Sequence, residues 1–470
     1  MPKVNIREID NTGSETFEYL NYTVLIPGPK FGIQLTTTPA QAGIDANNDG
    51  DFDDEGDTAP TAAVTTVEYV KEQLLVTPDD FDSSWKPVGA DGNILSDTSK
   101  YKKDLGFLMI KTLLNKGLSV YYVPAYTLDN EGYVTPLEDF IPVPDEFNPF
   151  KKFADKGRYD LRFITLGGLT ALNTNSELFI NLSKDALRCA GFRGDAVALL
   201  DAPEALLGTN DIDSWTQTAY QSLAKESISP DYRNGVQDKA DSSETFGRYG
   251  AFFAPFVTVN FDGELKNIPG SFNYLTCFAR YIANFKDWFA ISGSVRGISP
   301  LAGVTPLAEF GDSDINVFQA RDAGKNNMFK DHIATNVVCN IRPYGNIIWG
   351  NRTMHPLSEP RNGGPIQLTA SSFLNIRQLC CDIKKTLYRA ARRFTFEPNS
   401  DTLWYNFKGA ITPLLDEMKA NQGIKGYQVI KVKTNKKALL VARIKIVPIE
   451  AVEDFDLTVE LTDSIEVTEE

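Results

Sequence analysis

The sequence has few of the residues with which enzymes usually carry out acid–base or metal chemistry. It contains two histidines, His332 and His355, and neither lies near a nucleophile motif of the GxSxG type. We also find no phosphate-binding loop and no dinucleotide fingerprint. The sequence therefore predicts a structural building block rather than an enzyme.

Cysteine is scarce as well. The five cysteines are scattered, odd in number and without a CxxC pair: Cys189, Cys277, Cys339, Cys380 and Cys381. Free thiols in a reducing compartment are the expected state, and a zinc site is not expected. Cys380 and Cys381 lie in a helical pattern, in which adjacent side chains point to different faces.

Long apolar runs are absent. No run approaches the roughly 18 residues that span a bilayer, and residues 1–15 have no apolar core like that of a secretory signal. The 470 residues are 42 % hydrophobic and 23 % charged, which is typical of a globular chain with two or three domains. We expect a soluble protein that is made in the cytoplasm.

Basic residues are outnumbered overall but concentrated in one block. The net charge is −15, yet residues 341–450 carry 18 Lys and Arg against 7 Asp and Glu, while the last twenty residues hold 8 acidic residues and no basic one. A basic block inside an acidic chain indicates a partner that is chosen by electrostatics. A mixed, solvated face is the alternative.

The apolar periodicity predicts an α/β region over residues 100–300. Helical patterns alternate with strand patterns, which indicates a largely parallel sheet covered by helices. The predicted helices are 101–117, 177–192 and 214–227, and the predicted strands are 118–126, 161–168, 195–203 and 250–261. Before this region we expect two strands joined at a Pro-Gly turn near residue 28, and a helix over 65–75 that Thr65 and Glu68 open as a capping box.

An α+β unit is predicted after residue 300. Its expected strands are 336–345, 347–354, 427–433 and 437–449, and its expected helices are 371–394 and 402–423. Residues 453–463 then alternate apolar and polar side chains, which is typical of a strand with one apolar face.

Three short runs in this unit carry a family resemblance. The runs are NIIWGNRTM (346–354), LNIRQL (374–379) and FEPNSDTLW (396–404), and they fall in one order within about sixty residues. Together they resemble the C-terminal domain of contractile tail sheath proteins. RGDAVALLDAP (193–203) resembles part of the family's middle domain. The chain departs from the family runs at Gln378, where Arg is usual, and at Asn351, where a small residue is usual.

The resemblance implies a domain organisation. The expected parts are an N-terminal arm (1–24), a β-rich region with an acidic loop at 43–57 (25–99), an α/β middle domain of subtilisin-like topology (100–300), a tube-facing α+β sheath domain (301–450) and a C-terminal arm strand (451–470). A subtilisin-like topology is a fold analogy and implies no peptidase activity.

The resemblance also implies a function. Family members polymerise helically around a tail tube and contract to drive that tube through a cell envelope, which for a phage leads to genome ejection and host cell entry. The expected partners are other copies of the chain, the tail tube protein, and the baseplate and tail-terminator proteins, with no direct nucleic-acid binding and no membrane insertion. The expected location is a virion tail assembled in the host bacterial cytoplasm. A phage tail, a bacteriocin and another contractile particle all remain open.

The two chain ends are candidate contacts between subunits. An open helical array needs a different patch on each partner, and a terminal strand added to a neighbour's sheet provides one. The expected arm-strand residues are Val4, Ile6, Phe455, Leu457, Val459 and Leu461. The alternative is that the C-terminal strand completes the sheet of its own domain.

The predicted helix 371–394 carries a basic stripe, which we expect to face an acidic tube surface. Its residues are Lys384, Lys385, Arg389, Arg392 and Arg393. A solvated or intersubunit face is the alternative. The resemblance assigns a scaffold role to Trp349, Arg352, Arg377, Glu397, Asn399 and Trp404, and Arg352 and Glu397 are candidates for a buried ion pair.

The acidic loop resembles a calcium loop without completing one. Asp45, Asn47, Asp49, Asp51 and Asp53 are the candidate ligands, and Gly50 stands at the turn position. Gly56 occupies the place of the bidentate Glu, so the loop is not an EF-hand. A calcium-bound surface loop and a solvated acidic insertion both remain open, and a calcium-binding surface or adhesion module is the rival function. No cofactor is expected to be required.

Overall fold

The structure is a computed structural model that describes residues 22–451 apart from several gaps. The gaps are residues 39, 47, 49, 54, 56–57, 62–63, 79–80, 82–84, 96–103, 130–131, 143–148, 173–175, 226–244, 262, 283–284, 312–314, 316–317, 319–331, 357–367 and 435–438. The expected arm-strand residues Val4, Ile6, Phe455, Leu457, Val459 and Leu461, and the candidate calcium ligands Asn47 and Asp49, lie outside the described residues.

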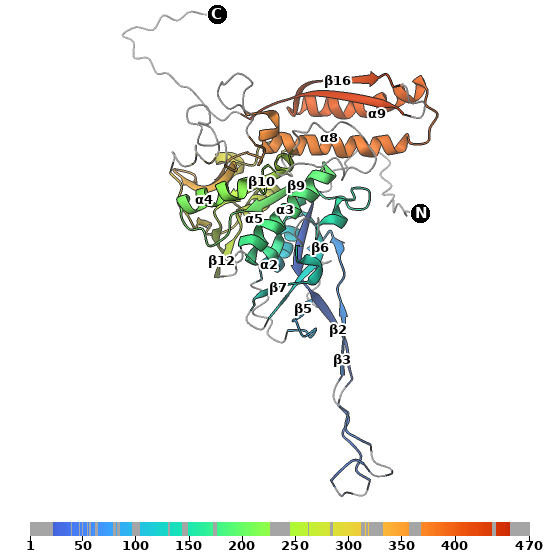
Figure 1. Cartoon of the computed structure of the whole chain (residues 1–470), viewed down its shortest axis with the longest axis vertical. Coiled ribbons are helices and arrows are strands. Elements are labelled where there is room, and N and C mark those ends of the chain that lie inside the picture. Colours follow the sequence, from blue (N-terminus) through green and yellow to red (C-terminus); the bar gives the residue numbers. More distant parts are fainter. Residues whose placement is uncertain are drawn as a thin grey trace, which may run out of the picture.

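A nine-stranded sheet forms the centre of the body (Figure 1). Its order is β15-β14-β10-β9-β8-β1-β6-β4, with β7 also paired to β6. Six strands run parallel: β1 (Thr23–Pro29), β6 (Ser119–Leu128), β8 (Phe163–Ile164), β9 (Val197–Asp201), β10 (Gly250–Ala254) and β14 (Thr335–Ile341). Three pair antiparallel at the margins: β4 (Gln73–Leu75), β7 (Val134–Pro136) and β15 (Gly345–Trp349).

Helices cover both faces of this sheet, as parallel sheets require. One face packs against α2 (Leu105–Asn115) and α5 (Gly270–Ile282), and the other packs against α3 (Ser176–Arg193) and α4 (Thr209–Tyr220). Successive side chains of β1 point to opposite faces of the sheet. Val24 packs into the core on the side of α2 and α5, and Leu25 packs into the core on the side of α3 and α4. The parallel α/β prediction is therefore confirmed.

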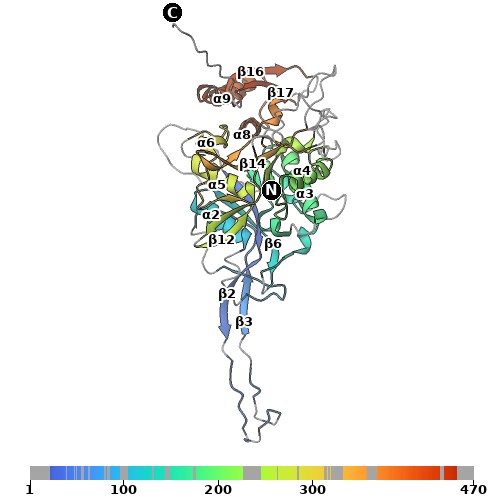
Figure 2. The same ribbon diagram turned by 90° about the vertical axis from the view of Figure 1, so that its left-hand side faces the viewer.

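The last four described elements form a separate layer. It consists of α8 (Leu374–Arg393), α9 (Asp401–Ala420), β16 (Ile424–Val432) and β17 (Val441–Pro448), and the two strands form their own antiparallel sheet. Figures 1 and 2 show that α8 lies between the body and the other elements of this layer. The layer has its own apolar cores, one around Leu379 and Leu415 and another around Trp404 and Ile411.

Two smaller sheets flank the body. One consists of β11 (Val257–Phe261), β12 (Glu264–Ile268) and β13 (Thr305–Pro306), and the other of β2 (Phe31–Thr38), β3 (Val64–Tyr69) and β5 (Lys86–Pro87). The β2–β3 hairpin projects from the body on the side away from α8 and α9, with the acidic loop at its far end (Figures 1 and 2).

Short helical segments complete the described elements. They are α6 (Gly293–Arg296) and the 3-10 turns η2 (Glu138–Phe140), η3 (Lys151–Ala154), η4 (Gly167–Leu172), η6 (Phe246–Tyr249) and η8 (Ala370–Ser372). Within the ranges the structure describes, no helix is long and apolar enough to cross a bilayer.

Two sequence predictions are wrong in this part of the chain. Residues 65–75 form strands β3 and β4 instead of a helix, because the β-branched run at 64–67 pairs with β2 and tertiary pairing outweighs the capping-box spacing. The single strand predicted over 250–261 is two strands in different sheets, separated at Pro255, which has no amide hydrogen for a sheet.

The sheet also crosses the expected domain limits. Strand β1 comes from the region predicted as 25–99, and β14 and β15 come from the region predicted as 301–450, yet all three belong to the central sheet. The body is therefore assembled from segments on both sides of residues 100–300. The domain limits themselves stay a prediction.

A buried carboxylate joins the end of β9 to the start of α5. Asp201 accepts hydrogen bonds from the Ser271 amide nitrogen at 2.7 Å and from its Oγ at 2.5 Å. Burial raises the pKa of Asp201 to about 7, against the lowering effect of the Ser271 hydrogen bonds. Because the folded pKa exceeds the unfolded value, the contribution of Asp201 to stability is present at low pH and is lost as the pH rises through about 7.

We expect Asp201→Asn to remove this pH dependence. The amide keeps an acceptor for the Ser271 N–H and adds a donor for its Oγ, but it carries no proton to lose. The thermal midpoint of the variant minus that of the wild type is therefore expected to increase from about pH 4 to about pH 7. The measurement is scanning calorimetry in matched buffers. Asp401→Asn is the control, since the pKa of exposed Asp401 is lowered by Lys431. A difference for Asp201→Asn that stays constant with pH contradicts the assignment.

Candidate functional site

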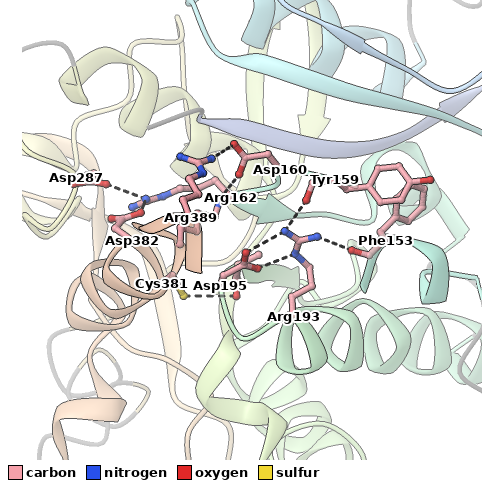
Figure 3. A network of polar contacts seen from close by, with 12 residues as sticks. Phe153, Tyr159, Asp160, Arg162, Arg193, Asp195, Asp287, Cys381, Asp382 and Arg389 are labelled. Atoms are coloured by element: carbon pink, nitrogen blue, oxygen red, sulfur yellow. Dashed lines mark hydrogen bonds and ion pairs between the residues drawn. The ribbon is translucent and has the colours of Figure 1, made fainter. Parts of the chain in front are cut away.

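A group of buried charges lies where α8 crosses the body (Figure 3). Arg162, just before β8, forms ion pairs with Asp382 on α8 and with Asp287, which follows α5. The Arg162–Asp287 distance is 2.9 Å, and all three side chains are at most 3 % exposed. The guanidinium also reaches Gln378 at 3.5 Å, and Gln378 donates to the Tyr274 hydroxyl at 2.5 Å. These contacts fix α8 to the sheet.

The electrostatics of this group follow from its burial. Burial raises the pKa of Asp382 well above the usual carboxyl range, the Asp287 carboxylate adds to the increase, and Arg162 opposes it. Burial lowers the pKa of Arg162, but Asp382 and Asp287 outweigh burial, so the net change is upward. Because one cation lies between two buried carboxylates, removal of any one of the three side chains is expected to lower the stability of the fold.

A second group of charges ties the same helix to the segment before β8. Asp160 pairs with Lys385 at 3.0 Å and with Arg389 at 2.5 Å. Burial raises the pKa of Asp160, but the two cations outweigh burial and hold the pKa below its usual value. Lys384, which directly precedes Lys385, donates to the Tyr249 hydroxyl at 2.9 Å.

These contacts correct the expectation for the basic stripe. Lys385 is 6 % exposed and Arg389 is turned toward Asp160, so both point to the chain's own body instead of a continuous outer surface. Arg392 and Arg393, in the last turn of α8, are exposed, and the Arg392 guanidinium lies 5.6 Å from the Tyr388 ring. A tube-facing role for the stripe stays a prediction.

The scaffold residues separate into buried and exposed members. Arg352 is fully buried, its guanidinium lies 4.8 Å from the Phe373 ring, and its backbone bonds the Asn336 side chain. Glu397 is exposed in the loop between α8 and α9, so the predicted Arg352–Glu397 pair is wrong. Tertiary packing encloses Arg352 within the body instead.

The remaining scaffold residues keep a structural position. Arg377 donates to Ser371 at 3.0 Å and lies 4.8 Å from the Tyr249 ring. Trp404 is buried in the layer core, Trp349 is half-buried against the body core, and Asn399 is exposed before α9.

A series of side-chain hydrogen bonds, which the sequence analysis did not predict, connects the body to the layer. The Asn351 Nδ2 donates to Asn375 Oδ1 at 2.7 Å, and Asn375 Nδ2 donates to the Trp288 carbonyl at 3.1 Å. The Trp288 Nε1 then donates to the Asn421 carbonyl at 3.0 Å, at the end of α9. The one feature of the sequence that pointed to these hydrogen bonds was that Asn351 departs from the family run. Nothing in the sequence pointed to the ion pair of Arg162 with Asp382, because the two residues are 220 positions apart.

The acidic loop shows a turn built on one carboxylate. Asp45 accepts from the backbone of Asn48 at 2.5 Å and of Gly50 at 2.9 Å, and Gly50 has φ +95°. Asp53 donates its backbone N–H to Asp51 at 3.4 Å. No group of three or more His, Cys, Asp or Glu side chains in the described part of the chain is arranged to bind a metal ion. Calcium binding by the loop stays a prediction.

The histidines and cysteines sit in unrelated surroundings. His332 Nδ1 lies 2.8 Å from Asp213, while burial lowers the pKa of His355 to about 4, so His355 is neutral near pH 7. All five cysteines are thiols, with Cys381 buried and its neighbour Cys380 half-buried on another face of α8. The thiol prediction is confirmed.

Comparison with known proteins gives one family match and several structural matches. Residues 369–462 match the family model of the phage tail sheath C-terminal domain. A search of curated protein sequences finds no match. The family resemblance predicted from the three short runs is therefore confirmed in the part of the chain that carries two of them.

The solved structures that match extend over almost the whole chain. They include the sheath complex of PVC, an extracellular contractile injection system, in its contracted state (TM-score 0.52, 15 % identity, 99 % of this chain and 98 % of that chain). Others are the contracted helical sheath of the anti-feeding prophage AFP (TM-score 0.50, 12 % identity, 98 % and 99 %) and the contracted AFP baseplate (TM-score 0.55, 14 % identity, 98 % and 98 %). At these identities the matches show a shared mixed α/β multidomain fold.

We expect Arg162→Met to destabilise the attachment of α8 strongly. Removing the cation leaves two buried carboxylates without their partner, which costs about 3–5 kcal/mol in comparable sites. Calorimetry should show a large fall in thermal midpoint, and limited proteolysis should cut within residues 374–450 before the body. Adding Asp382→Asn to Arg162→Met is expected to restore part of the loss.

The matched control is Lys286→Met. Lys286 pairs with Glu417 at 3.0 Å, but both side chains are about half exposed. Exposed pairs contribute roughly 0–1 kcal/mol, so this variant should melt close to the wild type. Equal losses for the Arg162 and Lys286 variants contradict a special role for the buried group.

Proposed function

We propose that this chain, which carries a phage tail sheath C-terminal domain on the fold of contractile sheath proteins, is the subunit of a contractile sheath. The observation that carries the proposal is the family match over residues 369–462 on a chain whose whole length shares the fold of contracted sheaths. The rival role as a calcium-binding adhesion module rests on the acidic loop alone, which occupies the end of one hairpin.

The proposed polymer is helical and is linked by the two chain ends. The chain enters the body at Tyr22, whose ring lies 5.6 Å from the Arg162 guanidinium, and it leaves the layer after β17. Strands β16 and β17 pair only with each other among the described strands, so each has one open edge. Arms that add strands at such edges link neighbours by about five hydrogen bonds of about 1 kcal/mol each, and repetition along the lattice multiplies the effect.

Contraction in this proposal is a change in packing between subunits. The buried ion pairs of α8 hold the layer to the body, so in this proposal the layer and the body of one subunit move together relative to its neighbours. An extended array that is metastable relative to a contracted one stores the energy in the difference between two packings, without a nucleotide. The subunit is assigned no catalytic role and no required cofactor.

The proposed setting follows the family. The subunit would surround a tail tube and join baseplate and tail-terminator proteins in a virion tail or a related contractile particle, assembled in a bacterial cytoplasm. The middle domain, of subtilisin-like topology, would carry the outer decoration, with calcium at the acidic loop as an optional ligand. The exposed end of α8, at Arg392 and Arg393, is the part of the basic stripe that supports a contact with the tube.

The test is negative-stain electron microscopy of the chain expressed alone at high concentration, with calcium or with chelator. Long, hollow, striated tubes are the expected result, and insensitivity to chelator assigns the acidic loop to decoration. Monomers that remain monomers after addition of a tube would contradict the proposal.

Deletion of residues 453–470 is expected to abolish polymerisation while leaving a folded monomer. The apolar cores found among the described residues lie in the body and the layer, so circular dichroism and the thermal midpoint should change little. Sedimentation should show the loss of large species. Deletion of only residues 467–470, which lie beyond the alternating segment, is the control. Normal tubes from the chain that lacks residues 453–470 would contradict the proposal that the C-terminal arm links subunits.

A further inference from the structure

Basic side chains gather where α8 lies beside η6. Arg377, in the first turn of α8, is 5 % exposed, and its guanidinium lies 4.8 Å from the Tyr249 ring. Lys384, two helical turns later on the same helix, donates to the hydroxyl of that tyrosine at 2.9 Å. Arg248 directly precedes Tyr249 in η6. Three basic residues from two elements therefore lie around one buried tyrosine.

A histidine from a third segment lies beside these cations. His355 belongs to the segment after β15, which is held next to η6 because the Met354 amide donates to the Gly250 carbonyl at 2.8 Å. Burial lowers the pKa of His355 to about 4, and the Arg248 and Arg377 guanidinium groups add to the decrease. His355 is therefore neutral near pH 7 and lies close enough for both arginines to act on it.

Several buried polar atoms of this region have no hydrogen-bond partner among the described residues. They are Arg377 Nε, His355 Nδ1 and the Oγ1 of Thr245, the residue that directly precedes η6. Within the same part of the chain, no carboxylate forms an ion pair with Arg377, Lys384 or His355. Buried polar groups normally have a partner and buried charges a counter-charge, so the region is suited to an anion. We call it the cationic cluster, and its residues are Thr245, Arg248, Tyr249, His355, Arg377 and Lys384.

We propose that the cationic cluster is a binding site for a phosphate-type oxyanion. Guanidinium groups donate in a fixed fork that matches phosphate oxygens, and the lysine ammonium adds a point charge. The Thr245 hydroxyl and the ring N–H of neutral His355 are further donors for the remaining oxygens. Three cations suit a phosphate group, which carries more than one negative charge at pH 7, better than a carboxylate with a single charge.

An anion in this site connects α8 to the body at a second place. Arg377 and Lys384 belong to α8, whereas Arg248 belongs to η6, which leads into β10 of the central sheet. The contact is separate from the ion pairs that α8 makes with Arg162 and Asp160. The attachment of the layer then depends on the concentration of phosphate as well as on the buried charges.

The test is the binding of inorganic phosphate to the full-length protein. Equilibrium dialysis with radiolabelled phosphate, at constant ionic strength, should show one saturable site per chain. Arg248→Met and Lys384→Met should each weaken binding about tenfold or more, because each removes one charge-assisted hydrogen bond to the anion. The matched control is Arg280→Met, which removes an exposed arginine at the end of α5 and should bind phosphate like the wild type.

Thermal unfolding gives a second readout of the same site. Phosphate at a hundred times its dissociation constant should raise the thermal midpoint of the wild type by about 2–4 °C. The increase should be smaller for Arg248→Met and Lys384→Met and unchanged for Arg280→Met, a comparison that removes the general stabilising effect of phosphate salts. Acetate at the same ionic strength should not reproduce the increase. Circular dichroism establishes that each variant is folded, and because Arg248 and Lys384 lie on different elements, either variant alone carries the test.

Three results would overturn the inference: no saturable binding to the wild type, unchanged binding to the two variants, or displacement of phosphate by acetate with equal affinity. The dialysis requires no polymer, so the inference and the sheath proposal can fail separately. A chain that forms tubes but binds no phosphate overturns the inference alone. A chain that binds phosphate at this site but forms no tubes, even with a tube template, supports the inference and contradicts the sheath proposal.

Discussion

The pairing of buried charge on one side of α8 is the constraint on which the rest of the arrangement depends. A guanidinium that is buried in the body requires its carboxylates, because an unpaired charge there costs several kcal/mol. Asp382 supplies one of them from the C-terminal third of the chain, and Asp287 supplies the other from the end of α5. The position of α8 over the sheet is therefore determined by polar chemistry as much as by apolar packing.

The spacing along α8 shows how one helix serves two neighbours. Gln378, Asp382, Lys385 and Arg389 recur at intervals of three and four residues and meet Arg162 and Asp160, which lie on one short segment of the body. Leu379, Ile383 and Leu387 recur at intervals of four and pack into the layer. The polar face binds the body and the apolar face binds the layer, so the two parts form one unit.

The parallel α/β body, the two C-terminal helices and the final strand pair could be predicted from the sequence. In each of them the apolar residues recur with a clear period, and turn residues mark where the element ends. Gly117, with φ +82°, ends α2 as its pattern indicates. Strands β3 and β4 were missed because the capping-box spacing is local, whereas the pairing of β3 with β2 is not. The basic stripe was found, but its partner Asp160 was not, since periodicity shows which residues share a helix face and carries no information on what that face meets.

The same reasoning explains why we propose the strand layer as the part that receives other subunits. Inner-face residues of β16 and β17, among them Tyr427, Val429, Ile444 and Ile446, are only half-buried by the helices below them. A two-stranded sheet is marginal in isolation, and its inner residues gain burial when a further strand extends the layer. In the body, by contrast, helices cover both sheet faces, and the buried Arg162 is paired with Asp287 and Asp382. The assembly that we propose would complete the strand layer and leave the body intact. It would add apolar burial and backbone hydrogen bonds without disturbing the ion pairs of α8, so a subunit would change its neighbours without changing its own fold.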